Sequence, residues 1–205
     1  MAPGEPPLVI DFLGGRVGWR WRRGGGRGQA IARAVGLRSG RPLPSVVDAT
    51  AGLGRDAFLL AVLGCAVTGL ERQAEVHAAL AAALAAAEAD VEAAAAMGGR
   101  LRFLRADARA WLAALPAAER PQVVLVDPMH PPRGKSALVK QEMRRLRELV
   151  GADEDAAELL AVARAAATDR VVVKRPAQAA PLAADVSHVV PGRSTRYDVY
   201  LGLRG

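Results

Sequence analysis

The sequence predicts a doubly wound α/β fold, with helices on both faces of a mostly parallel β-sheet. Short runs rich in β-branched residues alternate with longer runs rich in alanine and leucine, a pattern typical of repeated strand–helix–strand units. The short runs show little polar alternation, as expected of strands that are buried on both faces. Near the end, two strand-like runs flank a Pro-Gly-Arg-Ser turn, which indicates an antiparallel hairpin.

Seven segments are predicted as strands, and each has the length of an ordinary buried strand. Five alternate with helices, and the last two form the hairpin. The predicted strands are 44–48, 65–71, 100–104, 122–127, 169–174, 186–190 and 195–203. The sequence therefore predicts a seven-stranded sheet that is mostly parallel.

Five segments between the strands are predicted as helices. The longest is almost all alanine, leucine and glutamate and stops at Gly98-Gly99, and these features favour a helix and its C-terminal end. The segment 153–168 has three acids in its first turn, which suits the helix dipole. The predicted helices are 55–63, 73–97, 107–115, 136–150 and 153–168.

The first 43 residues differ in composition from the rest, so 1–43 is predicted to be a small basic extension and 44–205 the main domain. The extension is rich in glycine, arginine and tryptophan. Its part 8–28 is expected to be strand-like, with a short helix over 29–35.

Composition excludes several classes of protein. The chain has 205 residues, 51% of them hydrophobic, which suits one globular domain. One cysteine and three histidines exclude a disulfide framework and make a metal site unexpected. No apolar run reaches the length of a membrane span and the N-terminus does not resemble a signal peptide, so we expect a cytosolic protein that binds neither membrane nor metal.

The formal net charge of +7 favours a polyanionic partner. The excess of arginine over lysine could also reflect a GC-rich genome. Two basic clusters stand out, one within 11–28, where Trp19 and Trp21 lie among the arginines, and one within 133–147. Arginine pairs with phosphate, and tryptophan can stack on an unpaired base. The candidate RNA-binding residues are Arg20, Arg22, Arg23, Arg27, Lys135, Lys140 and Arg144.

Acids and glycines follow successive predicted strands, where ligands bind in open parallel sheets. Asp48 ends the first strand, and Gly52 and Gly54 in the next loop allow a close backbone approach to a ligand. Glu71, at the end of the second strand, can accept hydrogen bonds from two ribose hydroxyls. Asp107, after the third strand, can receive an adenine amino group. The pattern predicts an adenosine-containing cofactor.

Two cofactors fit this pattern. Gly52, Gly54 and Ala57 match a variant of the dinucleotide fingerprint and Glu71 matches its ribose acid, which would suit NAD and an oxidoreductase. However, Asp48 near the loop would repel a pyrophosphate and attract cations. S-adenosylmethionine (SAM) carries both a sulfonium and an ammonium, so the sequence favours SAM.

The fourth predicted strand ends in the dipeptide Asp127-Pro128. Proline lacks an N–H and keeps the preceding residue extended, so the Asp127 carboxylate and nearby carbonyls can converge on a small amino group. Such acceptors would orient a conjugated exocyclic amine, a poor nucleophile, toward a methyl donor. His130 could stack on the base or help to hold it. Asp127, Pro128 and His130 are the candidate catalytic residues, and the target base must be unpaired or flipped out.

Several of these segments together resemble the ribosomal RNA small subunit methyltransferase J family. The resemblance rests on VVDATAGLGRDAF (46–58), LER (70–72), VVLVDPMHP (123–131), KSALVKQEMR (135–144), RVVVKRP (170–176) and RYDVY (196–200). It implies a Rossmann-like SAM-dependent methyltransferase fold, SAM as cofactor, and methylation of guanosine N2 in the 16S rRNA of the 30S subunit. It also implies cofactor contacts at Arg55, Asp56, Glu71, Arg72, Asp107, Ala108 and Asp127, beside Asp48, Gly52 and Gly54 from the pattern above.

This chain departs from the family pattern at two places. Histidine stands at position 130, where the family has phenylalanine, and Asp107-Ala108 replaces the usual serines. Three other functions stay open from the residues alone: an NAD-dependent oxidoreductase, a non-catalytic RNA-binding module, and a DNA adenine-N6 methyltransferase with similar Asp-Pro chemistry.

Overall fold

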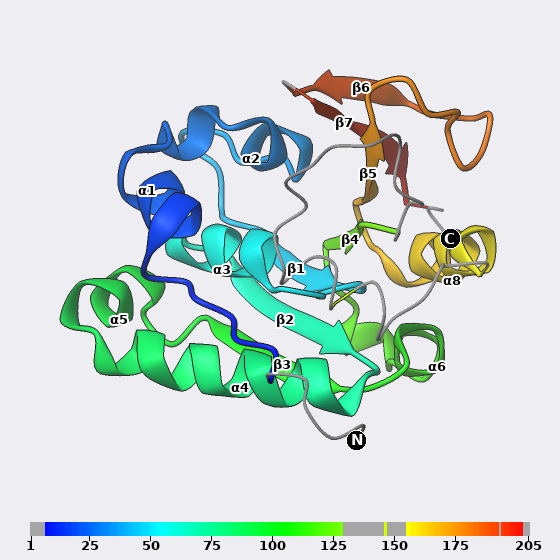
Figure 1. The fold of residues 1–205 in the computed structure, drawn as a ribbon. Coiled ribbons are helices and arrows are strands. Elements are labelled where there is room, and N and C mark those ends of the chain that lie inside the picture. Colours follow the sequence, from blue (N-terminus) through cyan, green and yellow to red (C-terminus); the bar gives the residue numbers. More distant parts are fainter. Residues whose placement is uncertain (1–6, 129–145, 147–154, 193, 203–205) are drawn as a thin grey trace.

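A computed structural model describes residues 7–128, 146, 155–192 and 194–202. In this part of the chain, seven strands form one sheet in the order β3-β2-β1-β4-β5-β7-β6 (Figure 1). The strands are β1 (Ser45–Asp48), β2 (Ala66–Glu71), β3 (Leu101–Arg105), β4 (Val123–Val126), β5 (Arg170–Pro176), β6 (His188–Pro191) and β7 (Thr195–Leu201). β1 to β5 are parallel, and β7 pairs antiparallel with β5 and β6. The predicted doubly wound sheet and its C-terminal hairpin are confirmed.

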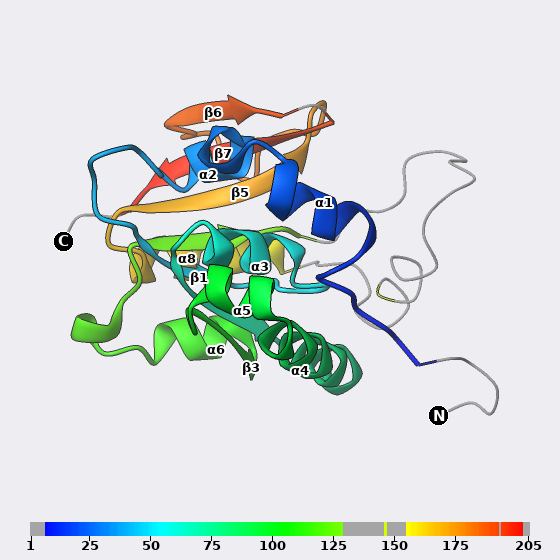
Figure 2. The same ribbon diagram turned by 90° about the vertical axis from the view of Figure 1, so that its left-hand side faces the viewer.

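Helices cover both faces of the sheet (Figures 1 and 2). The helices are α1 (Gly15–Arg23), α2 (Ala30–Ala34), α3 (Arg55–Val62), α4 (Ala74–Ala89), α5 (Val91–Met97), α6 (Ala108–Ala113) and α8 (Ala156–Ala166), with short 3-10 turns at Gly26–Gly28 and Ala117–Glu119. Helices α1 to α5 pack on one face, and α6 and α8 pack on the other. None of these helices has the length and apolar character of a membrane span.

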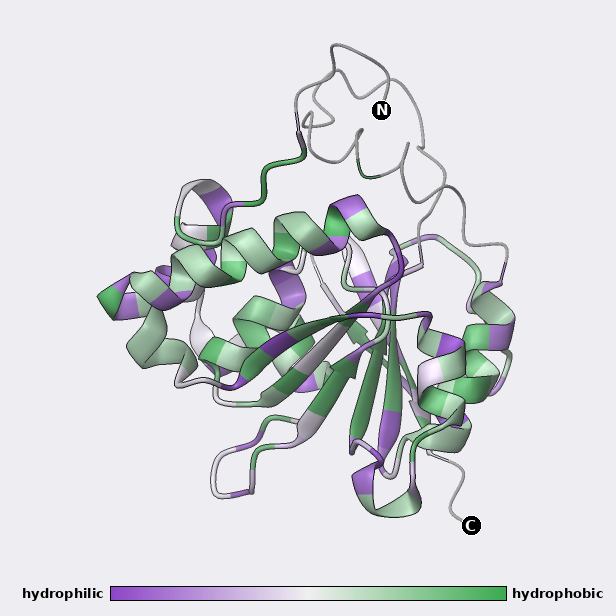
Figure 3. Cartoon of the chain, turned by 90° about the horizontal axis from the view of Figure 1, so that it is seen from below, coloured by the Kyte–Doolittle hydropathy of each residue, from purple (hydrophilic) through white to green (hydrophobic). Residues whose placement is uncertain are grey.

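The two faces of the sheet receive alternate residues of each strand, because side chains in a strand point to opposite sides in turn. Val172 packs in the core beneath α1 to α5, whereas Val171 and Val173 pack against α6 and α8. Val46 and Val47 of β1 divide between the two faces in the same way. Figure 3 shows the resulting hydrophobic strands between the helices. This alternation also fixes the face to which the polar residues at the strand ends point.

The single long helix predicted over 73–97 is wrong. The structure has two helices there, α4 and α5, and Asp90 separates them in an extended conformation (φ −84°, ψ 122°). The Asp90 carboxylate accepts a hydrogen bond from the Ala93 amide at 2.9 Å, so Asp90 caps α5. An aspartate competes with the helix backbone for its own hydrogen bonds, and here that local preference outweighs the surrounding alanines.

The strand-like conformation predicted for 8–28 is also wrong, because Gly15–Arg23 forms helix α1. This segment packs into the main core. The Phe12 ring stacks on that of Phe58 at 4.6 Å between ring centroids, and Trp21 packs edge-on against Phe58 at 6.1 Å. The Trp21 indole N–H donates to the Phe12 carbonyl at 3.1 Å. The N-terminal segment thus shares its core with the first half of the sheet.

Candidate active site

The carboxyl ends of β1 to β5 meet at one edge of the sheet, and two clefts open there. The first, here called the Glu71 cleft, includes Glu71, Arg72, Asp107, Ala108 and Asp155 in its lining. The second, called the Lys174 cleft, includes Asp48, Arg55, Asp56, Pro128 and Lys174. Thr50, Gly52 and Asp127 line both clefts. Asp127 therefore lies where the two clefts meet.

The loop after β1 is fixed by Glu71. The Glu71 carboxylate accepts hydrogen bonds from the Gln73 amide at 2.8 Å and from the Gly52 amide at 3.2 Å. Burial raises the pKa of Glu71, and these two N–H groups partly offset that shift. A carboxylate can accept more than two hydrogen bonds, so Glu71 can still accept further ones from hydroxyls in the cleft.

The two glycines of this loop differ in role. Gly52 (φ +52°) lines both clefts, and a Cβ there would meet the Leu146 side chain at 3.4 Å, which is ordinary contact. Gly54 (φ +65°) is buried, and a Cβ there would lie 2.6 Å from Leu80 and 2.9 Å from Phe103. Gly54 lines neither cleft, so the packing of the core explains it, whereas the sequence predicted that it approaches a ligand.

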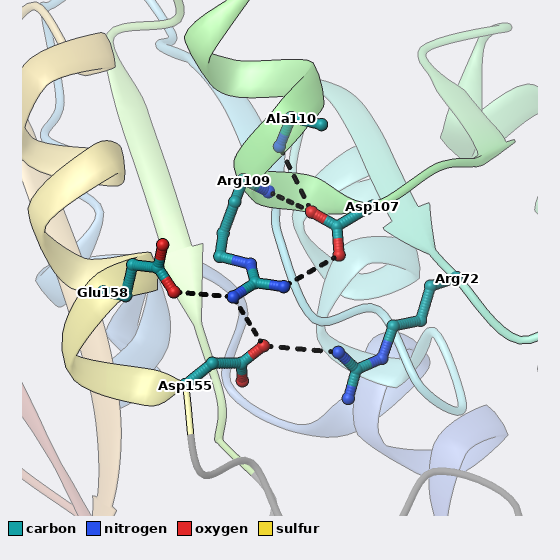
Figure 4. A network of polar contacts seen from close by, with 6 residues as sticks. All are labelled: Arg72, Asp107, Arg109, Ala110, Asp155 and Glu158. Atoms are coloured by element: carbon teal, nitrogen blue, oxygen red, sulfur yellow. Dashed lines mark hydrogen bonds and ion pairs between the residues drawn. The ribbon is translucent and has the colours of Figure 1, made fainter.

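A network of charged residues surrounds Asp107 at the rim of the Glu71 cleft (Figure 4). Asp107 caps α6 by accepting from the amides of Arg109 at 3.0 Å and Ala110 at 3.2 Å. Burial opposes a fall in the pKa of Asp107, but these bonds and the Arg109 guanidinium lower it. The Asp107 carboxylate therefore already accepts hydrogen bonds from α6, and the predicted hydrogen bond from an adenine amino group would be an additional one.

Arg109 connects this cap to α8. Its guanidinium lies 2.7 Å from Glu158 and 3.2 Å from Asp155, and Asp155 also pairs with Arg72 at 3.3 Å (Figure 4). The network joins the ends of β2 and β3 to α8 across the cleft. Sequence analysis did not place Asp155 at this site, because its partners Arg72 and Arg109 lie far away in the chain.

A chain of four alternating charges runs from Arg20 on α1 into the Lys174 cleft. Arg20 pairs with Asp56 at 2.7 Å, and the Lys174 ammonium donates to Asp56 at 2.9 Å and to Asp127 at 2.7 Å. Burial alone would raise the pKa of Asp56, but Lys174 and Arg20 lower it to about 2. Burial alone would lower the pKa of Lys174, but Asp56 and Asp127 hold it well above its ordinary value. Both oxygens of Asp56, a predicted cofactor contact, thus bind cations of the chain itself.

Asp48 lies beneath this chain of charges, with 3% of its surface exposed. Burial and the nearby Asp56 carboxylate raise the pKa of Asp48 to about 7. Thr50 connects Asp48 to Asp127, since its amide donates to Asp48 at 3.2 Å and its hydroxyl accepts from the Asp127 amide at 2.6 Å. Thr50 is a site residue that sequence analysis missed, although it stands inside the loop motif that was singled out.

The predicted RNA-binding arginines of the first cluster divide into two kinds. Arg20 and Arg22 make internal contacts, Arg20 with Asp56, and Arg22 with Glu92 at 2.7 Å and over the Trp21 ring at 4.2 Å. Arg22 is nevertheless exposed, as are Arg23, Arg27 and Trp19. The described residues do not include His130, Lys135, Lys140 and Arg144, nor the predicted helix 136–150 apart from Leu146.

The fold and the acids at the strand ends define a SAM-dependent methyltransferase, and the comparisons agree. The family model described as "Putative SAM-dependent methyltransferase" matches residues 2–202. A crystal structure of a SAM-dependent methyltransferase from Neisseria gonorrhoeae superposes with a TM-score of 0.75 at 35% identity, covering 98% of this chain and 77% of that one. These matches exclude the alternative that the chain is an NAD-dependent oxidoreductase.

Curated relatives give the family. Ribosomal RNA small subunit methyltransferase J of Brucella anthropi is 54% identical over 196 residues, which are 95% of this chain and 93% of the relative. The protein of that name from Thioalkalivibrio sulfidiphilus is 52% identical over 202 residues, which are 98% of this chain and 78% of the relative. The chain belongs to the ribosomal RNA small subunit methyltransferase J family, and SAM is its cofactor.

Proposed function

We propose that this enzyme methylates the exocyclic N2 of a guanosine in 16S rRNA of the small ribosomal subunit. The observation that carries the proposal is the position of Asp127 where the two clefts meet. One cleft has the acids expected around an adenosine, and the other would receive the base. The names of the relatives support a small-subunit rRNA substrate, and such a substrate implies a cytoplasmic enzyme.

The residues present fit SAM. Glu71 would accept hydrogen bonds from the ribose hydroxyls, and Asp107, Ala108 and Arg72 lie along the same cleft for the adenine. Gly52 would lie beside the methionine portion, and the buried Asp48 in the adjoining cleft would favour a cationic group. When bound, SAM supplies an electrophilic methyl carbon on a positively charged sulfur.

Asp127 would hold the nucleophile. The lone pair of a guanine N2 amine is conjugated into the ring, so the amine is a poor nucleophile until its hydrogens are drawn out of the ring plane. The Asp127 carboxylate can accept one of these N–H groups, and the following Pro128 restricts the backbone that carries it. As the new N–C bond forms, the methyl–sulfur bond of the sulfonium would break, and a carboxylate at this position would stabilise the positive charge that develops on nitrogen until one amine proton leaves to water.

The RNA would approach over exposed basic residues of the N-terminal segment and over the basic residues that follow Asp127 in sequence. Arg23 of α1 and Arg27 of the following 3-10 turn would contact phosphates, and the exposed Trp19 of α1 would offer a stacking surface. Lys135, Lys140 and Arg144 follow Asp127 in sequence and would add to the positive charge that meets the RNA. A base within a duplex cannot reach Asp127, so the guanosine must be unpaired or flipped out.

The test is transfer of a tritiated methyl group from SAM to 30S subunits and to naked 16S rRNA, followed by nucleoside analysis. We expect N2-methylguanosine from the wild type. The D127A variant should bind SAM with nearly unchanged affinity in calorimetry and lose turnover by about 10²- to 10⁴-fold. D185N is a matched control, since Asp185 is an exposed acid paired with Arg164 away from both clefts.

Three results would contradict the proposal. Wild-type turnover in D127A would remove Asp127 from catalysis. RNA binding without methyl incorporation would indicate a non-catalytic module. Methyladenine in place of N2-methylguanosine would assign a different base.

A further inference from the structure

We propose that Lys174 is a positioning residue for the methyl transfer: it fixes the Asp127 carboxylate from the neighbouring strand β5, and Arg20 of the N-terminal helix holds Lys174 in place through Asp56. The inference rests on the proposed function, because it concerns how the Asp127 carboxylate is oriented toward the amine of the substrate. The nearest alternatives are that Lys174 contacts RNA directly or that it only terminates β5.

The strand register brings these residues together. Val126 of β4 lies opposite Val173 of β5, so the residues that follow, Asp127 and Lys174, are neighbours at the edge of the sheet. Lys174 has the same parity along β5 as Val172, which packs on the face covered by α3. Asp127 has the same parity along β4 as Leu125, which packs on that face too. Both side chains therefore point to the face where α3 presents Asp56.

The contacts fix Asp127 at two points. Thr50 accepts a hydrogen bond from its backbone amide at 2.6 Å, and Lys174 donates to its carboxylate at 2.7 Å. The Asp127 side chain is 39% exposed, so without Lys174 its carboxylate would be free to rotate toward solvent. Only one carboxylate oxygen, Oδ2, contacts Lys174. Oδ1 has no partner among the described residues and can face an amine in the cleft.

Lys174 is itself held in place. Its ammonium is 2.9 Å from Asp56 on α3, and the Asp56 side chain is only 11% exposed. The other oxygen of Asp56 takes Arg20 at 2.7 Å, and Arg20 donates to Gln29 at 2.8 Å. The line Arg20–Asp56–Lys174–Asp127 therefore runs from the N-terminal helix to the proposed catalytic carboxylate. Desolvation of buried charges offsets much of their mutual attraction, so we expect this line of ion pairs to contribute little to stability. Its contacts instead restrict the orientation of Lys174 and Asp127.

The experiment compares K174M and K174R with R170M, in kinetics with 30S subunits or 16S rRNA. Arg170 is a matched control because it is a largely buried cation at the other end of the same strand and pairs with Asp169. We expect K174M to lower kcat by about 10- to 100-fold, with the RNA KM and the calorimetric affinity for SAM nearly unchanged. K174R should recover part of kcat, and R170M should match the wild type. R20M should lower kcat by a smaller factor.

A double-mutant cycle with D127A tests whether Lys174 acts through Asp127. If it does, adding K174M to D127A lowers turnover no further. Additive losses, or a K174M variant with raised RNA KM and wild-type kcat, would overturn the inference and leave the proposed function intact. Wild-type kcat in R20M would show that Arg20 does not hold Lys174 in place through Asp56. Urea unfolding of every variant identifies loss of fold. If K174M does not fold, K174R decides the question: wild-type kcat in a folded K174R variant whose side chain does not contact Asp127 would refute the role of Lys174.

Discussion

Replacing Asp48 with asparagine should make stability less dependent on pH. Asp48 is the last residue of β1 and is buried at 3% exposure. Burial and the Asp56 carboxylate raise the pKa of Asp48 from 3.8 to about 7. Asparagine has nearly the same shape, carries no charge, and can still accept the hydrogen bond that the Thr50 amide donates at 3.2 Å.

The magnitude follows from linkage. The pKa of Asp48 in the folded chain, about 7, is about 3 units above its ordinary 3.8, and each unit corresponds to about 1.4 kcal/mol, so ionised Asp48 costs at most about 4 kcal/mol. Below pH 4 the group is protonated in both states and costs nothing. Between pH 4 and 7 only the unfolded chain ionises, so stability falls as pH rises. Above pH 7 both states are ionised and the full cost applies.

The assay is urea unfolding of wild type and D48N from pH 4 to pH 8. The variant should gain little at pH 4 and be more stable than the wild type by up to about 4 kcal/mol at pH 8. D185N serves as the control, because the pKa of the exposed Asp185 is lowered by Arg164 and its ionisation lies below this range. A stability difference between D48N and wild type that is the same at every pH would refute the assignment of a buried, protonated Asp48.

Two further predictions concern ligands. SAM binding should release a proton from Asp48 near pH 6 to 7, because a cationic ligand in the adjoining cleft favours the ionised carboxylate; calorimetry in buffers of different ionisation enthalpy measures it, and D48N should release none. R23A should weaken RNA binding and flatten its salt dependence, whereas R22A should mainly lower stability, because Arg22 binds Glu92 and covers Trp21. Filter binding at several salt concentrations distinguishes the two variants. An equal loss of RNA affinity in both would contradict the different roles assigned to Arg23 and Arg22.

The strands of the sheet could be predicted because their signal is local. A buried parallel strand is a short run of β-branched residues, and such runs stand out wherever they occur. The acids of the Glu71 cleft followed from the same property, since the carboxyl ends of parallel strands meet at one edge. Helix α1 could not be predicted in this way. Its sequence is rich in glycine and arginine, and it is stabilised by packing of Trp21 and Phe12 on Phe58, which lies more than 30 residues away.

The charge pairs of the Lys174 cleft depend on the order of the strands, which the sequence does not state. Arg20 and Asp56 are 36 residues apart, and Lys174 and Asp127 are 47 apart. Each pair becomes adjacent only when β5 lies beside β4 and α1 lies over α3. A charge count along the chain therefore assigned Arg20 to the RNA surface, whereas the structure commits it to Asp56.

This reassignment changes how the basic N-terminal segment would contribute to function. Arg20 and Arg22 form ion pairs with Asp56 and Glu92, so Arg23 and Arg27 are the predicted phosphate contacts that remain in this segment. The same helix that would receive the RNA backbone also braces Asp56, and through Lys174 the carboxylate that would hold the base. RNA contact at α1 and the orientation of Asp127 would thus depend on neighbouring residues of one helix. A change in α1 would then affect turnover as well as affinity, which a purely electrostatic docking arm would not do.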